Sequence, residues 1–426
     1  MRAPPGAAEA ALDRMLAGME RGAALGLAVS GGGDSMALLA LAAERVPPAL
    51  SLFAVTVNHG LRPEAHDEAA LVARTAARLG VEHTVLKWDA RTRRGNLQAA
   101  AREARFRLIG DWAQRRGIGA VALAHTQDDQ AETVLLRLAR GSGVDGLSGM
   151  ATVREAVGIR WLRPFLQVSR ATLRAALEAR GIDWAEDASN LDPRYHRVRA
   201  RRALAALAPL GIDAAGLAAT ASRMQRARDA LEAETARALA DHASDDRGTV
   251  LVDRAALHLL PEIRDRVFAQ LLMAVTGAAH RPRLAALHRC IAAAQGAGAT
   301  LAGARLRPEV ARLRIFREYR AVEGLRVPAD ACWDHRWRAL APPSAEEAEI
   351  AALGPDGLRL LSRQAADGAH PHWREMGLPQ AALESLPAIW RGPRLLAAPL
   401  AFWPAGWAFD VRPAAAPGAT DTIRIE

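Results

Sequence analysis

A short apolar run that leads into three consecutive glycines is the clearest hydrophobic pattern in the chain. Residues 25–29 (LGLAV) predict a buried strand, residues 30–34 (SGGGD) a tight loop, and residues 35–45 a helix with regularly placed apolar side chains. In such a unit the glycines let a phosphate approach the backbone, and the free amides at the helix start attract negative charge. The pattern predicts an anion-binding loop. The alternative is a glycine-rich turn that only joins strand and helix.

The alternation of strand and helix continues to about residue 124. Strands are predicted over residues 50–57, 81–88 and 118–124, with helices over residues 63–79 and 96–116 between them. This spacing predicts an α/β fold with a doubly wound parallel sheet, whose ligands bind at the carboxyl ends of strands. Polar clusters follow three of the strands: SGGGDS at 30–35, NHGLR at 58–62 and HTQDDQAET at 125–133.

Two further parts are predicted after this sheet. Helical patterns cover residues 169–180, with Ser169 as the N-terminal cap, and residues 213–242, 264–276 and 281–295, and short strands are predicted within 299–321. We predict an α/β catalytic domain over residues 1–210, a mainly helical middle domain over 211–325, and a smaller α+β C-terminal domain over 326–426. The loop 141–149 is predicted to be exposed and mobile, and the tail from Pro413 to be disordered.

The charged residue of the glycine-rich loop is Asp34, whereas the common mononucleotide loop carries a lysine. An aspartate beside phosphates is repulsive unless a divalent cation lies between them, so the loop indicates a nucleotide bound with Mg²⁺. SGGGDS also resembles the SGGxDS loop of the PP-loop ATPases, which split ATP into AMP and pyrophosphate while adenylating a substrate.

A cluster of carboxylates follows the strand that ends near residue 124. Asp128, Asp129 and Glu132 lie within about one helical turn, and the spacing places Asp128 and Glu132 on one face, with Asp129 to the side. Like charges this close are unfavourable unless they bind cations, and a metal or the ammonium groups of a diamine would explain them. The alternative is a solvated acidic turn that complements the helix dipole.

Two groups of arginines are candidate contacts for a polyanion. Arg102 and Arg105 lie three residues apart on one predicted helix, and Arg197, Arg199 and Arg201 follow an aromatic residue and a carboxylate-rich segment. Stacking aromatics next to arginines are typical of single-stranded RNA binding. Solvated helix faces and local salt bridges remain the alternatives.

The composition agrees with an anionic partner but does not establish one. The formal net charge is +9 and the sequence pI about 10.8, which favours nucleic acid. Nearly all of this charge is arginine, because Lys87 is the only lysine. We expect a cytoplasmic protein without a membrane segment, in which Cys290 and Cys332 are reduced thiols, and a homodimer is one candidate oligomeric state.

Taken in order, the motifs SGGGDS, NHGLR, GNLQAAARE, AHTQDDQAET, RPFL, WAEDASN and YHRVRARR resemble those of the bacterial tRNA(Ile)-lysidine synthases. These enzymes use ATP to adenylate the wobble cytidine of the tRNA(Ile) with anticodon CAU and then join L-lysine to it. The resemblance implies that ATP is held by Ser30, Gly31, Gly32, Gly33, Asp34, Ser35 and His59, with Asp34 assisting Mg²⁺. Asp129 and Glu132 would bind the lysine amines, and His125 would lie beside the reacting groups, with Asp34, His125 and Asp129 as the catalytic residues. Arg102, Arg105, Arg197, Arg199 and Arg201 would contact the tRNA.

The sequence also departs from this family's usual motifs. Thr126 stands where a second histidine is common, Phe106 in place of a tyrosine, Ala188 in place of a proline, and Val198 in place of an asparagine. Rival hypotheses are a tRNA thiolase, a PP-loop amidotransferase, and a catalytically silent RNA-binding protein that keeps ATP. The thiolase and the amidotransferase need cysteines in or beside the nucleotide domain, and neither Cys290 nor Cys332 is there.

Overall fold

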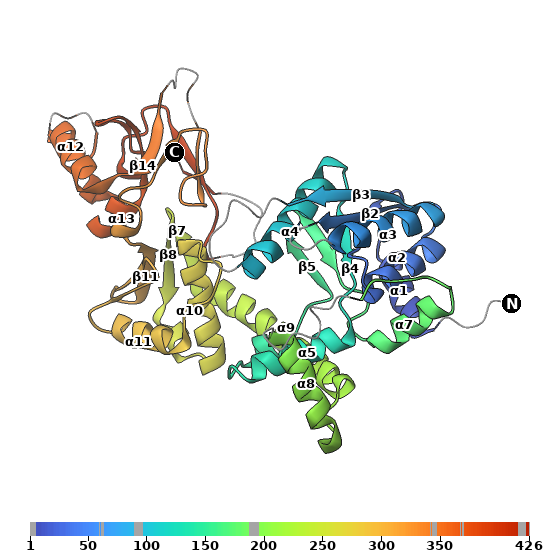
Figure 1. Ribbon diagram of the computed structural model, residues 1–426. Helices are drawn as coiled ribbons and strands as arrows, with labels where there is room; N and C mark the ends of the chain where they lie inside the picture. The colour runs from blue at the N-terminus through green and yellow to red at the C-terminus, as the bar shows by residue number, and fades with distance from the viewer. Residues whose placement is uncertain are drawn as a thin grey trace. The chain divides into compact units, whose positions relative to one another are not determined.

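The computed structural model in Figure 1 describes residues 6–58, 60, 64–88, 97–186, 196–340, 342, 347–366, 368, 370–415 and 423–425. The chain divides into two compact units, Met1–Asp229 and Ala230–Glu426. We describe each unit by itself.

A six-stranded sheet forms the centre of the first unit. Its strands are β1 (Ala24–Ala28), β2 (Ser51–Asn58), β3 (Glu82–Lys87), β4 (Ala120–Leu123), β5 (Val153–Ala156) and β6 (Ile159–Leu162), in the order β3-β2-β1-β4-β6-β5. All neighbours are parallel except β5 and β6. The predicted parallel α/β sheet is confirmed, and the edge hairpin of β5 and β6 extends it.

Four helices of the first unit begin and end close to the residues predicted for them, 35–45, 63–79, 96–116 and 169–180, and the other helices of this unit have no predicted bounds. The helices are α1 (Ala7–Ala17), α2 (Gly33–Arg45), α3 (Glu64–Arg78), α4 (Leu97–Arg115), α5 (Gln127–Leu138), α6 (Val144–Leu147), α7 (Arg170–Glu178) and α8 (His196–Leu207). The long helix α9 (Ala214–His242) contains the boundary between the two units. Ser169 caps α7, as predicted, by accepting a hydrogen bond from the Thr172 amide.

The sheet has a separate hydrophobic core on each face. One core joins Leu25 and Leu27 of β1 to buried residues of α1, α2, α3 and α7. The other contains Trp112 of α4 and Trp161 of β6, together with Val121 of β4. Successive strand residues point to opposite faces, so a run of apolar residues serves both cores at once. This burial holds the strand ends, and the polar clusters that follow them, in fixed positions.

The loop 141–149 differs from its prediction as an exposed, mobile segment. It contains helix α6, and Ser148 is buried. Arg137 donates hydrogen bonds to the carbonyl oxygens of Gly146 and Gly149, at 2.7 and 2.9 Å. A glycine-rich sequence does not reveal that an arginine of the preceding helix will hold it in place.

The second unit begins with a five-stranded antiparallel sheet and two helices. The strands are β7 (Ala243–Asp246), β8 (Thr249–Asp253), β9 (Ala299–Leu301), β10 (Ala304–Pro308) and β11 (Arg312–Arg317), in the order β7-β8-β11-β10-β9. Their core also contains α10 (Pro261–Thr276) and α11 (Leu284–Ala294), which includes the buried Cys290. Residues 244–246 belong to β7, and Arg247 and Gly248 form the turn that leads into β8.

The last part of the chain builds two small sheets around a tryptophan-rich core. Its elements are β12 (Arg326–Pro328), β13 (Trp337–Leu340), β14 (Glu349–Ala352), α12 (Gly354–Ala366), α13 (Gln380–Ser385), β15 (Pro387–Arg391), β16 (Arg394–Ala397), β17 (Ala408–Val411) and β18 (Ile423–Ile425). Trp333, Trp337 and Trp390 are buried in this core, so they stabilise the fold and are not available for stacking on RNA.

The described residues of the tail, 413–415 and 423–425, differ from the predicted disorder. Ala414 is buried, and the amides of Ala414 and Ala415 donate hydrogen bonds to Asp245. Residues 423–425 form β18, which pairs with β17. The structure divides the chain into two units. The division into three domains, over residues 1–210, 211–325 and 326–426, remains a prediction from the sequence.

Among the described residues, no single helix is long and apolar enough to cross a membrane. The pair His196–Leu210 and Ala214–His242 passes that test only when both are taken together, and the two are bent by 99° relative to each other.

A substitution at Gly31 tests whether the loop between β1 and α2 needs a glycine at this position. Its φ of +93° lies in the region that side chains rarely adopt, and a Cβ there would lie 3.3 Å from the Cβ of Glu68. We expect Gly31→Ala to lower the free energy of unfolding by about 1–3 kcal/mol, and the thermal midpoint by several degrees. Gly32→Ala is the matched control, because Gly32 has a φ of −72° and a Cβ there would make only an ordinary contact, 3.8 Å from the Ser30 hydroxyl oxygen. Equal midpoints for the two variants would contradict this account.

Candidate active site

The loop between β1 and α2 is held by its two serines. The Ser35 hydroxyl donates to the Gly32 carbonyl at 2.9 Å, accepts from the Ser30 amide at 3.1 Å, and lies 3.2 Å from the Ser30 hydroxyl. Gly32 caps α2 without a side-chain hydrogen bond. Amides at the start of α2 therefore meet no side-chain acceptor at the cap, as expected for an anion site.

A distant segment lies along this loop. Ala185 forms a parallel bridge with Gly32, and its amide donates to the Gly31 carbonyl at 2.9 Å. The ring of Trp184 packs so closely that a Cβ on Gly33 would lie 3.3 Å from it. The start of the WAEDASN motif thus supports the nucleotide loop. Its last four residues, and Tyr195 after it, lie outside the described residues.

The carboxylates of the predicted site meet at one arginine that the sequence analysis did not select. Arg170, the first residue of α7, donates from Nε to Asp34 Oδ2 at 3.0 Å and from Nη2 to Asp129 Oδ1 at 3.3 Å. Its backbone amide donates to Asp128 Oδ2 at 2.8 Å. Arg170 therefore joins the helices that follow two neighbouring strands, β1 and β4.

Asp129 is fixed by the helix start on which it lies. Thr126 caps α5: its backbone amide and hydroxyl lie 2.9 and 3.1 Å from Asp129 Oδ2, and the Asp129 amide lies 3.3 Å from the hydroxyl. This reciprocal arrangement satisfies both groups inside the protein. Thr126, which departs from the family pattern, is completely buried and acts as a cap.

Glu132 is paired with an arginine that was predicted to contact tRNA. Arg201 of α8 donates to Glu132 Oε1 from Nε at 2.9 Å and from Nη2 at 2.8 Å. The Glu132 side chain is only 1% exposed, and its Oε2 is buried without a hydrogen-bond partner among the described residues. Asp129 and Glu132 are the buried pair, whereas Asp128, four residues before Glu132 on α5, accepts a hydrogen bond from the start of α7.

Burial and neighbouring charges shift the pKa values of Asp34, Asp129 and Glu132 in different directions. Burial raises the pKa of Asp34, and Arg170 opposes this effect. Burial also raises the pKa of Glu132, the Asp129 charge adds to the increase, and Arg201 opposes it. Burial acts in the same direction on Asp129, but Arg170, the Thr126 amide and neighbouring positive groups outweigh it, so the pKa of Asp129 is lowered. Asp129 is held in its charged form.

The remaining predicted residues are spread around this centre. His125 is half-buried directly before the cap of α5, and its charge contributes to the low pKa of Asp129. Arg197 also lies close enough to act on Asp129. Arg199 is exposed on α8 and contacts His196, and Arg105 is exposed on α4. His59 and the side chain of Arg102 lie outside the described residues.

Val198, the other departure on α8, is buried. Helix α8 packs against α5, whose Ala131 and Val134 are buried as well.

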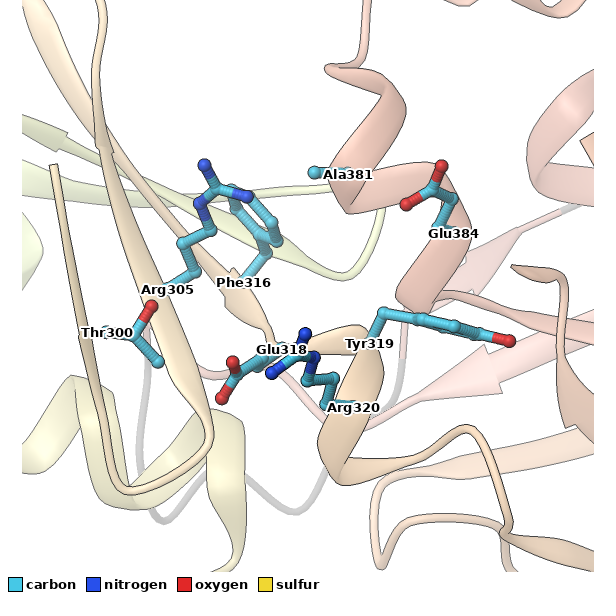
Figure 2. A pocket seen from close by; sticks show the side chains of 8 residues that line it. All are labelled: Thr300, Arg305, Phe316, Glu318, Tyr319, Arg320, Ala381 and Glu384. Atoms are coloured by element: carbon cyan, nitrogen blue, oxygen red, sulfur yellow. The ribbon is translucent and has the colours of Figure 1, made fainter. Parts of the chain in front are cut away.

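A separate cavity of about 220 Å³ lies in the second unit and is shown in Figure 2. Its lining combines two arginines, two glutamates and two aromatic residues: Thr300, Arg305, Phe316, Glu318, Tyr319, Arg320, Ala381 and Glu384. The positive and negative charges balance, and none of the predicted site residues lies there. We assign the chemistry to the first unit.

The fold and the site define the class of protein. Residues 7–208 match the PP-loop domain family, which binds ATP. The chain is 46% identical over 390 residues to the tRNA(Ile)-lysidine synthase of Ruegeria pomeroyi, which covers 91% of each chain. It is 45% identical over 274 residues to the tRNA(Ile)-lysidine synthase of Methylobacterium nodulans, covering 64% of this chain and 80% of that one.

A solved structure, the U34-tRNA thiolase NcsA from Methanococcus maripaludis, is similar at 15% identity with a TM-score of 0.43, over 51% of this chain and 77% of that one. That likeness is too weak to carry an argument. The protein is a PP-loop enzyme. It belongs to the tRNA(Ile)-lysidine synthase family.

The cap of α5 provides a test of how Asp129 is held. Thr126→Val keeps the shape of the side chain but removes the hydroxyl, so we expect the free energy of unfolding to fall by about 1–2 kcal/mol. Thr126→Ser keeps the hydroxyl and should retain most of the stability. Thermal unfolding of both variants measures the difference. If valine and serine give the same midpoint, the cap does not have the role described.

Proposed function

We propose that this protein ligates L-lysine to carbon 2 of the wobble cytidine of tRNA(Ile) with anticodon CAU, using ATP and releasing AMP and pyrophosphate. The observation that carries this proposal is the meeting of the phosphate-binding loop and the buried Asp129 and Glu132 at one end of the sheet. We call the loop 30–35 with Asp34 the nucleotide half-site, and Asp129 with Glu132 the amine half-site.

The chemical problem is that the 2-carbonyl oxygen of cytosine is a poor leaving group. Attack of this oxygen on the first phosphorus of ATP expels pyrophosphate and makes the oxygen part of a good leaving group. A neutral amine then attacks carbon 2, AMP departs with the oxygen, and the amine loses a proton. The free amides at the start of α2 would bind the nucleotide phosphates.

Asp34 is the residue that we propose to hold Mg²⁺. Its Oδ1 is buried without a hydrogen-bond partner in the described part of the chain, and an unsatisfied carboxylate oxygen beside a phosphate loop suits a hard cation. When bound, Mg²⁺ would neutralise phosphate charge. Among the described residues, no group of three or more His, Cys, Asp or Glu side chains forms a metal site by itself.

The amine half-site suits the two positive groups of lysine. Asp129 stays charged because its pKa is lowered, which favours binding of an ammonium group. Glu132 has a raised pKa and a buried, unpartnered Oε2, which favours hydrogen bonding to an amine and acceptance of its proton. His125 is the other candidate for the proton acceptor. Arg197 and Arg199 of α8, with Arg102 and Arg105 of α4, remain the proposed tRNA contacts.

Arg201 has a different role from the one predicted for it. Its guanidinium neutralises Glu132 in this structure, so we propose that it positions that carboxylate. A direct phosphate contact by Arg201 would leave the buried Glu132 without its partner.

The deciding experiment incubates the purified protein with ATP, Mg²⁺, labelled L-lysine and tRNA transcripts. We expect the label to enter tRNA(Ile) with anticodon CAU, because the site combines an ATP-binding loop with an amine-binding pair. A transcript with uridine at the wobble position, and a reaction without ATP, are the controls. No label in the CAU transcript would rule out the proposed function.

Glu132→Gln tests the amine half-site separately. The substitution removes the negative charge but keeps the size of the side chain, so lysine incorporation should fall by at least about tenfold, the value of one hydrogen bond to a charged group. ATP binding should persist, because the nucleotide half-site is intact. Glu178→Gln, at an exposed position of α7, is the control. Unchanged dependence on lysine concentration would remove Glu132 from the amine half-site.

A further inference from the structure

One guanidinium connects the two half-sites of the proposed reaction. Arg170 contacts Asp34 with Nε and Asp129 with Nη2, so it lies between the nucleotide and amine half-sites. Its side chain is 20% exposed, and those of Asp34 and Asp129 are 24% and 11% exposed. The contact is thus shielded from water on most sides, where charge pairs interact strongly.

The backbone of Arg170 is held firmly, whereas its side chain is long. Ser169 caps α7, the Arg170 amide is bound by Asp128, and Leu173 and Leu177 are buried in the core that also contains α2. A change in the Arg170 contacts must therefore come from its side chain. The guanidinium can exchange partners without movement of the helix.

The carboxylate oxygens of Asp129 and Asp34 differ in how many hydrogen bonds they already accept. Asp129 Oδ2 already receives two hydrogen bonds from Thr126, so an ammonium group at Asp129 has to approach Oδ1, where Nη2 of Arg170 is bound. Asp34 Oδ1 has no such partner, so Arg170 can remain on Asp34 Oδ2 while the nucleotide half-site is filled. A bound amine therefore competes with one end of Arg170 only.

We propose that Arg170 is a positioning residue that couples lysine binding to ATP binding. A lysine ammonium at Asp129 releases Nη2, and the released end adds a donor and positive charge beside the nucleotide phosphates. Each substrate then binds more tightly when the other is present, because binding couplings are reciprocal. This inference rests on the proposed function, since it takes Asp129 as the amine site.

The coupling is measured as a ratio of two dissociation constants. The probe is α,β-methylene-ATP with Mg²⁺, which cannot be split between its first two phosphates, and calorimetry measures its Kd without lysine and with saturating L-lysine. In the wild type we expect lysine to lower this Kd by at least about fivefold, the lower end of typical couplings. In Arg170→Gln the ratio should fall to about one, because no cation bridges the two half-sites. Arg170→Lys keeps the charge but lacks the planar fork, so it should lose most of the coupling as well.

Arg180→Gln is the matched control. Arg180 follows the same helix and also bridges two carboxylates on different elements, Glu44 and Glu9, with a side chain that is 23% exposed. It should keep the wild-type ratio. If Arg170→Gln unfolds, Arg170→Lys provides the measurement, and thermal unfolding of all variants separates lost coupling from lost structure.

The outcomes distinguish this inference from the proposed function. A wild type that makes lysidine but shows no effect of lysine on the nucleotide Kd overturns the coupling alone. A coupling that survives in both Arg170 variants also overturns it. A wild type that incorporates no lysine removes the proposed function, and the coupling with it. Loss of the ratio in both Arg170 variants, with retention in Arg180→Gln, supports the inference.

Discussion

Neutralisation of buried negative charge is the constraint on which this site depends. Three carboxylates, Asp34, Asp129 and Glu132, are brought together at the ends of neighbouring strands, where burial and mutual repulsion disfavour their charged forms. Arg170 and Arg201 supply the opposing charges. Removing either arginine would leave a buried carboxylate uncompensated, which is more costly than breaking an exposed pair.

The fold supplies these charges from segments that are far apart in the chain. The β1 and β4 strands are neighbours in the sheet, so the helices after them begin side by side. Helix α7 packs against α2 and brings Arg170, whereas α8 packs against α5 and brings Arg201. The apolar faces of these two helices therefore determine the electrostatics of the site, even where their residues do not contact it.

The sequence predicts the local features well because each has a local physical signature. The apolar run before three glycines predicts the loop, and the carboxylates that follow a strand predict an acidic cluster, in which the family resemblance points to Asp129 and Glu132. Arg170 has no such signature, since its partner Asp34 is 136 residues away. The pairing of Arg201 with Glu132 is hidden for a related reason, because a basic helix face looks the same in sequence whether it binds RNA or a buried glutamate. Thr126 does have a local signature, because a threonine three residues before an acidic residue fits the capping-box spacing.

Arginines already neutralise the two carboxylates of the proposed amine half-site, and this affects which ligands the half-site can bind. Positive groups of the protein occupy Asp129 Oδ1 and Glu132 Oε1, whereas Glu132 Oε2 has no hydrogen-bond partner among the described residues. In the proposed amine half-site, an ammonium group at Asp129 therefore gains only the difference between its own contact and that of the Arg170 end that it displaces. Such an exchange keeps the net charge of the pocket nearly constant and avoids the cost of empty, repelling carboxylates. It also favours a ligand with two correctly spaced cationic groups over a small monovalent cation, since only the former can replace Nη2 of Arg170 at Asp129 and reach Glu132 Oε2 at the same time. Selectivity for a diamine then follows from the protein's own arginines as much as from its acids.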